Sequence, residues 1–337
     1  MATLAPGQTL DQYEISDTIA RGGMATIFKA RDLETGKTVA LKVPHMEYES
    51  DLVFHERFLR EEHIGQRLSH PAIVKVLQPK QKSRMYLAME YVEGERLSDL
   101  LHREGRLAVD PAIRLAMRIA DALIYLHDNG IAHRDLKPEN IVITPRSGDV
   151  KLMDFGIALD STARKMTWSG LSHTMGTPDY MAPEQIKGNR GDIRCDIYSL
   201  GAILYEMLTG EVPFSNDNVY AAMRAKVQDD PTPPRRLRPD ISPALEEIIL
   251  HALERNPRDR FETALEFREA LGHPESVILT NRAERQRPKR RVSSGWRTLL
   301  TVTGALAAFA AIWLALAAGI SMLEAHGVVP AKHTGNP

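Results

Sequence analysis

The sequence predicts an α+β fold with two lobes, a small strand-rich lobe followed by a larger helical lobe. Short β-branched runs broken by glycines dominate up to about residue 91, and helical periodicity dominates from there to about residue 271. Apolar residues make up 43% of the 337 residues and charged residues 26%, which is enough apolar material for a core. This order of elements predicts a cleft between two lobes, where ligands usually bind.

The predicted strands come first along the chain. They are the runs 13–20, 26–31, 38–43, 74–77 and 85–91. One helix, over 54–68, interrupts them. In the second part, Asp110 is the expected N-cap of a long helix with Pro111 at its first position, and Gly130 ends it. Ser242 and Pro243 begin another helix in the same way.

The most specific motif is His-Arg-Asp-Leu-Lys-Pro-Glu-Asn at 133–140, which resembles the catalytic loop of the protein kinase family. The resemblance implies that Asp135 orients the acceptor hydroxyl and takes its proton. It also implies that Lys137 reaches the γ-phosphate of ATP and that Asn140 holds a magnesium ion. These residue types suit those tasks: a carboxylate as base, a cation for phosphate charge and an amide oxygen for a hard metal.

A second motif, Asp-Phe-Gly, begins fourteen residues after Asn140, at Asp154. Alone, this triplet could be a turn with a buried phenylalanine. At this distance from the catalytic loop it resembles the metal-binding triplet of the same family, which implies that Asp154 coordinates Mg²⁺, or Mn²⁺ in its place.

Lys42 lies in a strand-like run, Val-Ala-Leu-Lys-Val, that resembles the lysine strand of protein kinases. A lysine on a strand usually faces solvent. The resemblance instead implies that Lys42 pairs with the α- and β-phosphates and needs a glutamate partner. Glu61 and Glu62 are adjacent candidates. Helical spacing favours Glu61, since the residues at −3, +3, +4 and +7 from it are Phe58, Ile64, Gly65 and Leu68.

The expected phosphate loop departs from the family pattern, because Ala20 and Ala25 replace the first and third glycines and only Gly22 remains. Alone, this segment would predict a simple hairpin. Alanine gives up the freedom to adopt positive φ, which bears on ATP affinity but not on the type of reaction. The resemblance implies that ATP is contacted by Ile19, Ala20, Arg21, Gly22, Gly23, Ile27, Ala40, Lys42, Met89, Glu90 and Val92.

The segment from Gly176 to Glu184 resembles the end of a kinase activation segment. The resemblance implies that Thr177 bonds to Asp135 and Lys137, a feature of serine/threonine kinases, and that Glu184 pairs with Arg260. It also implies that Asp196 braces the catalytic loop from a buried helix. Arg134 would bind a phosphate on this segment. Autophosphorylation is expected at one or more of Thr167, Ser169, Ser172 and Thr174.

The C-terminal part predicts a membrane anchor. Residues 298–323 carry no charged side chain, and as a helix they would be about 39 Å long against a bilayer core of about 30 Å. The flank before them is basic, through Arg282, Arg285, Arg287, Lys289, Arg290, Arg291 and Arg297. The positive-inside rule therefore places the kinase domain in the cytoplasm and the C-terminus outside a plasma or inner membrane. Small residues along 304–315 offer a face for a homodimer.

The expected organisation is a kinase domain over 13–271 with lobes meeting at about 91–92, a basic juxtamembrane linker over 272–297, the span, and a short extracytoplasmic tail over 324–337. A net charge of −1 predicts no nucleic-acid binding, and a single cysteine, Cys195, excludes an internal disulfide. A membrane-tethered pseudokinase scaffold is the alternative function, although every catalytic position is filled. A small-molecule phosphotransferase lacks support, because those relatives do not carry this activation segment.

Overall fold

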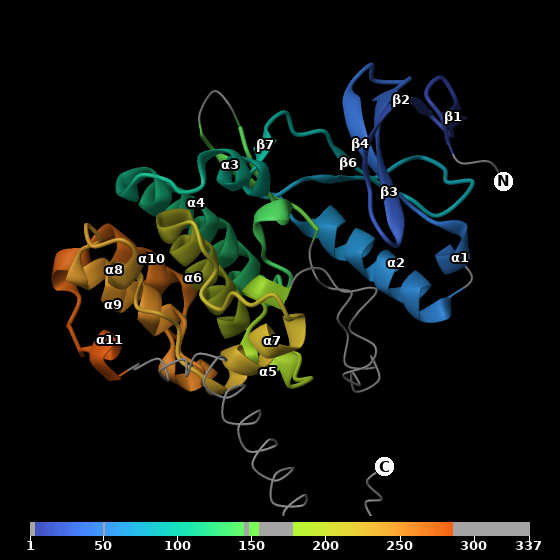
Figure 1. Cartoon of the computed structure of the whole chain (residues 1–337). Coiled ribbons are helices and arrows are strands. Elements are labelled where there is room, and N and C mark those ends of the chain that lie inside the picture. The colour runs from blue at the N-terminus through green and yellow to red at the C-terminus, as the bar shows by residue number, and fades with distance from the viewer. Residues whose placement is uncertain (1–3, 50, 145–147, 155–177, 286–337) are drawn as a thin grey trace, which may run out of the picture. The chain divides into compact units, whose positions relative to one another are not determined.

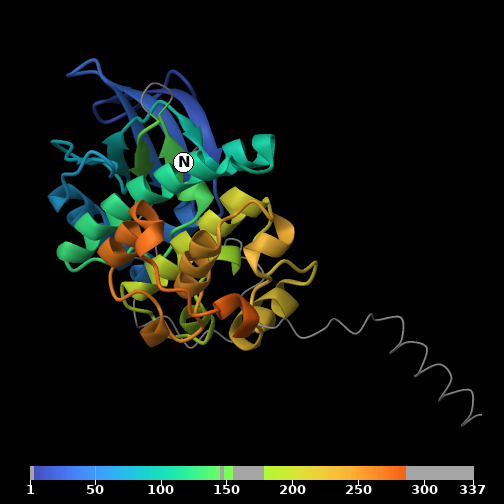
Figure 2. The same ribbon diagram turned by 90° about the vertical axis from the view of Figure 1, so that its left-hand side faces the viewer.

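The computed structural model describes residues 4–49, 51–144, 148–154 and 178–285, and the chain divides into two units, Met1–Arg287 and Pro288–Pro337. All of the described residues belong to the first unit. The strands of its six-stranded sheet gather in one lobe and its long helices α4 and α6 lie in the other (Figures 1 and 2). The predicted two-lobed α+β fold is therefore confirmed.

The small lobe is built on an antiparallel sheet, which has six strands in the described residues, in the order β1-β2-β3-β4-β6-β5. The strands are β1 (Thr9–Leu10), β2 (Tyr13–Arg21), β3 (Ala25–Asp32), β4 (Thr38–Pro44), β5 (Val76–Leu77) and β6 (Leu87–Glu90). The helices α1 (Met46–Glu49) and α2 (Leu52–Arg67) lie between β4 and β5 in the chain. The Asp51 carboxylate caps α2 by accepting from the amides of Val53 and Phe54.

The large lobe is helical, with a small sheet of β7 (Glu95–Arg96), β8 (Ile141–Ile143) and β9 (Val150–Leu152). Its helices are α3 (Leu97–Glu104), α4 (Val109–Asp128), α5 (Pro183–Ile186), α6 (Arg194–Thr209), α7 (Val219–Gln228), α8 (Pro234–Leu237), α9 (Pro243–Ala252), α10 (Ala264–Gly272) and α11 (Arg282–Arg285), with the short 3₁₀ helices η1 (Pro138–Asn140), η3 (Pro178–Tyr180), η4 (Pro257–Asp259) and η5 (Pro274–Ser276). Almost every residue of α6 is buried. A Cβ on Gly201 would lie 2.7 Å from the Ala252 Cβ, so glycine permits the close approach of α6 to α9.

Some predicted boundaries differ from the structure. Asp110 is not the N-cap of α4, because the helix already begins at Val109 and the extended residue Ala108 precedes it without a side-chain cap. The strands predicted over 74–77 and 85–91 are shorter, since only β5 and β6 pair in the sheet. The start of α9 is confirmed: the Ser242 hydroxyl accepts from the Leu245 amide at 3.1 Å.

The predicted membrane segment 298–323, its basic flank beyond residue 285 and the tail 324–337 lie outside the described residues. Among the helices that the structure does describe, none combines the length and hydropathy needed to cross a bilayer.

Candidate active site

Lys42 joins the two lobes through a pair of carboxylates. In the centre of the sheet, β4 pairs it with Ile27 and Leu87. Its Nζ lies 3.0 Å from Glu61 Oε1 on α2 and 2.8 Å from Asp154 Oδ1 after β9. The side chains of Lys42, Glu61 and Asp154 are 19%, 9% and 30% exposed, so the cluster opens to solvent on the Asp154 side.

Glu62, the other candidate partner, takes no part in this cluster. It forms an ion pair with Lys82. The one-residue difference turns the side chain by about 100° around the helix axis. The structure thus brings Glu61, and not its neighbour, to Lys42.

The electrostatics of this cluster differ between its members. Burial alone would lower the pKa of Lys42, but Asp154 and Glu61 outweigh it and hold that pKa above its ordinary value. Burial also acts to raise the pKa of Asp154, yet the Lys42 ammonium keeps it below its usual range. For Glu61, burial and the nearby Asp154 charge raise the pKa despite Lys42. Asp154 is therefore the firmly ionised carboxylate, which suits a metal ligand.

The catalytic-loop residues lie close together around Asp135. Lys137 Nζ lies 2.8 Å from Asp135 Oδ2, and Asn140 Nδ2 donates to both the carbonyl oxygen and Oδ2 of Asp135, at 2.8 and 3.1 Å. A carboxylate with a cation and an amide beside it can accept a hydroxyl proton while the cation offsets phosphate charge.

Asp196 fixes the backbone of this loop from α6. Its carboxylate is fully buried and accepts from the amides of His133 and Arg134, at 2.8 and 2.7 Å, and from His127 Nε2 at 2.9 Å. Burial acts to raise the pKa of Asp196, but these hydrogen bonds and His127 outweigh it and lower the pKa. An ionised carboxylate in this place holds the residues directly before Asp135 in position.

A further contact connects the catalytic loop to the Asp154 segment. The Met153 amide donates to the Asn140 carbonyl at 2.9 Å, and His133 Nε2 lies 3.2 Å from the Met153 carbonyl oxygen. Asn140 and Asp154 are thereby brought to the same region. No group of three or more acidic, histidine or cysteine side chains that could hold a metal occurs in the described residues. One amide and one carboxylate fit a Mg²⁺ ion that is completed by phosphate oxygens and water.

Two residues of the site have positive φ without being glycine. Arg134 has φ 64° and Asp154 has φ 50°. Such left-handed conformations are uncommon for these side chains and concentrate at functional sites. Arg134 directly precedes Asp135, and Asp154 is itself the expected metal ligand.

The phosphate-loop alanines fit their backbone without strain. Ala20 lies within β2 and Ala25 begins β3, and neither has positive φ. The Gly22 amide donates to the Ala25 carbonyl at 2.9 Å, and a Cβ on Gly22 would lie 3.3 Å from that oxygen, so only the retained glycine is tightly placed. Ile19, Arg21 and Gly23 are exposed in the same hairpin.

The residues expected to contact adenine share one apolar cluster. Ala40 pairs with Met89 across β4 and β6. Both are buried, and Ile27 and Val92 pack against the same cluster. Glu90 follows at the end of β6, and its carboxylate accepts from the Lys75 amide at 3.0 Å and forms an ion pair with Lys151.

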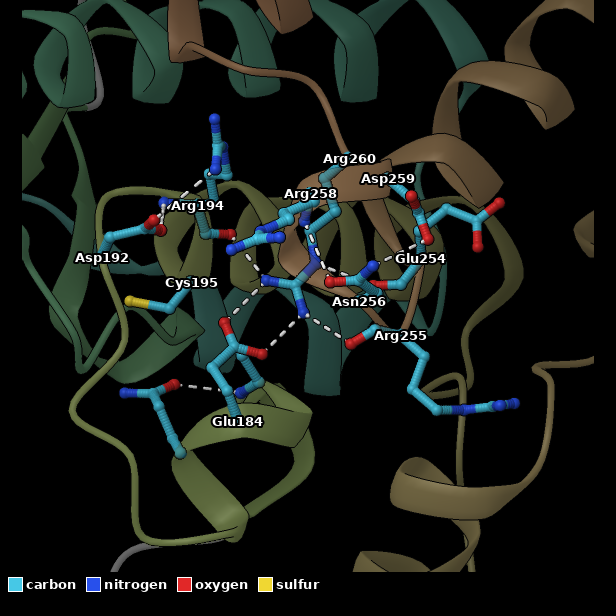
Figure 3. Close-up of polar contacts among 12 residues, drawn as sticks. Glu184, Asp192, Arg194, Cys195, Glu254, Arg255, Asn256, Arg258, Asp259 and Arg260 are labelled. Carbon is cyan, nitrogen blue, oxygen red and sulfur yellow. Dashed lines mark hydrogen bonds and ion pairs between the residues drawn. The ribbon is translucent and has the colours of Figure 1, made fainter.

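Arg260 and Glu184 form a fully enclosed pair that anchors α5 (Figure 3). The two guanidinium nitrogens Nη1 and Nη2 each lie 2.7 Å from a different Glu184 oxygen. The remaining donors reach the carbonyls of Arg194, Glu254 and Arg255, at 3.0, 2.7 and 3.3 Å. All five N–H donors of the guanidinium are therefore used.

Several predicted residues lie outside the described part of the chain: Thr177, Thr167, Ser169, Ser172, Thr174, and the Phe155 and Gly156 of the metal triplet. Arg134, their expected phosphate partner, donates to the Gly191 carbonyl through Nε and Nη2, both at 3.4 Å.

Sequence reasoning missed several contacts that support the site. They include His127 bonded to Asp196, the Glu90–Lys151 ion pair, and Gln185 Nε2 donating to the Arg134 carbonyl at 3.0 Å. The helical face of α4 contained a histidine among apolar residues, which was the one available signal. The other contacts join segments too far apart for a spacing rule.

Comparison with known proteins identifies relatives of this chain. The family model for the protein kinase domain matches residues 13–274. Serine/threonine-protein kinase PknB of Mycolicibacterium smegmatis is 40% identical over 273 residues, which are 79% of this chain and 43% of that protein. Serine/threonine-protein kinase pkn3 of Myxococcus xanthus is 39% identical over 84% of this chain and 53% of that protein. The chain thus spans about half the length of these relatives.

Solved structures share the fold. The PknI kinase domain of Mycobacterium tuberculosis, in its C20A mutant, superposes with a TM-score of 0.64 at 27% identity over 82% of this chain and all of that one. Rad53 in complex with AMP-PNP superposes with a TM-score of 0.63 at 31% identity, over 79% of this chain and 66% of that chain.

Proposed function

This chain belongs to the protein kinase family and carries a serine/threonine kinase domain, and from that premise we propose that it phosphorylates protein serine and threonine residues from the surface of a membrane. The observation that carries the proposal is the bridge of Lys42 between Glu61 and Asp154, at 3.0 and 2.8 Å. The bridge connects α2 of the small lobe to the segment after β9 in the large lobe. The Met153–Asn140 hydrogen bond connects that segment to the catalytic loop.

In this proposal each residue of the site has a distinct task. Asp135 orients the acceptor hydroxyl and receives its proton, and Lys137 offsets the charge of the γ-phosphoryl group. Lys42 positions the inner phosphates of ATP. Asn140 and Asp154 hold Mg²⁺, which neutralises phosphate charge when bound. The AMP-PNP complex of the structural relative Rad53 supports ATP as the donor.

The membrane location and the mode of activation are further parts of the proposal. The uncharged stretch 298–323 and its basic flank support a single span with the kinase domain in the cytoplasm and the short tail outside. The hydroxyl-rich segment before Thr177 supports autophosphorylation, with Arg134 as the phosphate partner. The small residues along 304–315 support a homodimer in which this face of the proposed helix pairs with the same face of a second chain.

The 337-residue chain in lipid nanodiscs, given labelled ATP, Mg²⁺ and a generic acceptor protein, tests the proposed reaction. We expect Asp135→Asn and Lys42→Ala to reduce labelling by about 10²–10⁴-fold, whereas Asp99→Asn, an exposed aspartate on α3, should leave it unchanged. Acid hydrolysis should yield phosphoserine and phosphothreonine. Equal labelling of all four proteins would contradict catalysis at this site and favour the pseudokinase scaffold.

A further inference from the structure

The three residues of η3, Pro178–Tyr180, are held by side chains from two helices of the large lobe. Lys226 Nζ on α7 donates to the Pro178 carbonyl at 2.7 Å and to the Asp179 carbonyl at 2.5 Å. Ser199 Oγ on α6 donates to the Tyr180 carbonyl at 2.8 Å. Three consecutive backbone carbonyls therefore each accept a hydrogen bond from a side chain. The Tyr180 hydroxyl adds a fourth hydrogen bond, which it donates to Glu206 Oε2 at 2.6 Å.

Lys226 is unusual among the cations that the structure describes. It is 3% exposed, its Nζ lies 5.8 Å from the centroid of the Tyr198 ring, and no ion pair with a carboxylate is formed within the described residues. Arg260 lies over the same ring, 4.9 Å from its centroid. Arg260, which holds α5, and Lys226, which holds η3, therefore both lie over the Tyr198 ring.

A buried ammonium without a paired carboxylate is an expensive way to stabilise a fold. Desolvation opposes its charge, and an apolar side chain of similar volume is often as good or better for stability. Burial lowers the pKa of Lys226 to about 7, although Asp179 acts in the opposite direction. The free-energy cost of burying the Lys226 ammonium has a physical reason if the Pro178 and Asp179 carbonyls must be held at fixed positions.

The held residues lie at a place where position affects the reaction. Pro178 directly follows Thr177, the residue expected to bond to Asp135 and Lys137. Further along, Gln185 on α5 donates to the Arg134 carbonyl, directly before Asp135. The segment 178–185 is therefore fixed to α6 and α7 at one end and to the catalytic loop at the other.

We propose that Lys226 is a positioning residue for phosphoryl transfer, which fixes the end of the activation segment so that the acceptor protein meets a preformed site. The inference rests on the proposed kinase function. It assigns Lys226 no contact with ATP. Loss of Lys226 should therefore impair use of the acceptor protein and not binding of ATP, because the residues expected to contact ATP lie on other elements.

Steady-state kinetics of the Lys226→Met variant of the 337-residue chain in nanodiscs tests this role. We expect kcat/KM for the acceptor protein to fall about tenfold, while KM for ATP stays within twofold, since the lost hydrogen bonds serve only the acceptor side. Lys226→Arg, which can donate to both carbonyls, should recover most of the loss. Arg224→Met removes an exposed cation from the same helix and should behave as wild type.

Backbone hydrogen exchange supplies a readout that does not depend on activity. Amides of residues 179–182 should exchange faster in Lys226→Met than in wild type or Arg224→Met. If Lys226→Met does not fold, Lys226→Gln, which retains one neutral donor, takes its place. A folded variant with wild-type acceptor kinetics overturns the inference. An inactive wild-type protein would instead contradict the proposed function, before any variant is compared.

Discussion

The clusters around Lys42 and Arg260 use the same kinds of charged side chain in opposite ways. At Lys42 one ammonium faces two carboxylates, and the Asp154 side chain is 30% exposed. At Arg260 one guanidinium faces one carboxylate, its side chain is 0% exposed, and all five donors are matched (Figure 3). The first cluster retains negative charge that a metal ion can neutralise, whereas the second is internally satisfied.

This contrast distinguishes reactive from structural ion pairs in this domain. An excess of charge of one sign next to solvent leaves a site for a ligand of the opposite charge. A balanced pair, enclosed and fully hydrogen-bonded, has nothing left to bind and fixes the chain instead. Breaking the two clusters should therefore have different consequences, one for stability and one for catalysis.

The Arg260 cluster gives the largest expected effect. Arg260→Met leaves the Glu184 carboxylate buried without its partner, which should cost about 3–5 kcal/mol of unfolding free energy. Urea unfolding of the full chain in detergent, followed by far-ultraviolet circular dichroism, measures it. Arg258→Met removes an exposed arginine two residues away and should stay within about 0.5 kcal/mol of wild type. Equal stability of the two variants would remove the structural role assigned to Arg260.

The Lys42 cluster should respond in activity more than in stability. Glu61→Gln removes one of the two carboxylates that hold Lys42, and we expect kcat/KM to fall about tenfold, the worth of one charge-assisted hydrogen bond. Glu62→Gln changes the neighbouring residue, whose ion pair is with Lys82, and should remain within twofold. Initial rates at varied ATP compare the two. A larger loss in Glu62→Gln would contradict the assignment of the partner.

Lys226 is a third case, because its charge is neither part of an excess of one sign nor balanced by a paired carboxylate within the described residues. Its pKa of about 7 in the folded protein lies below the ordinary 10.5, so folding favours the neutral amine. Protonation between pH 10.5 and 7 therefore destabilises the fold as pH falls, and below pH 7 the loss is complete. Between pH 8 and 7 wild type should lose about 1 kcal/mol relative to Lys226→Met. Urea unfolding at the two pH values measures this difference, and parallel pH profiles would contradict it.

The features that could be predicted from the sequence are those set by local spacing. The lobe order follows from a change of periodicity along the chain, and the Glu61 position follows from the apolar residues around one helix. The start of α9 was readable because Ser242 and Pro243 each have a local preference for the end of a helix. The start of α4 was misplaced at Asp110, because a good capping residue lies just inside a helix that begins without a side-chain cap.

Other contacts could not be predicted because they depend on how distant elements pack. His127 and Asp196 are 69 residues apart, and Glu90 and Lys151 are 61 apart, so no periodic pattern connects them. Nothing in the local sequence around Lys226 indicates that it is buried, since its burial arises only when α7 packs against η3. The phosphate-loop alanines have less conformational freedom than the glycines they replace, but their strand positions require no positive φ.

The positive φ angles of Arg134 and Asp154 bear on how this enzyme could be engineered. Each such angle favours glycine or asparagine and costs an ordinary side chain about 1 kcal/mol or more. A redesign that optimised thermostability from backbone shape alone would replace both residues first. It would thereby delete the proposed phosphate partner and the proposed metal ligand, and we expect a more stable protein without turnover.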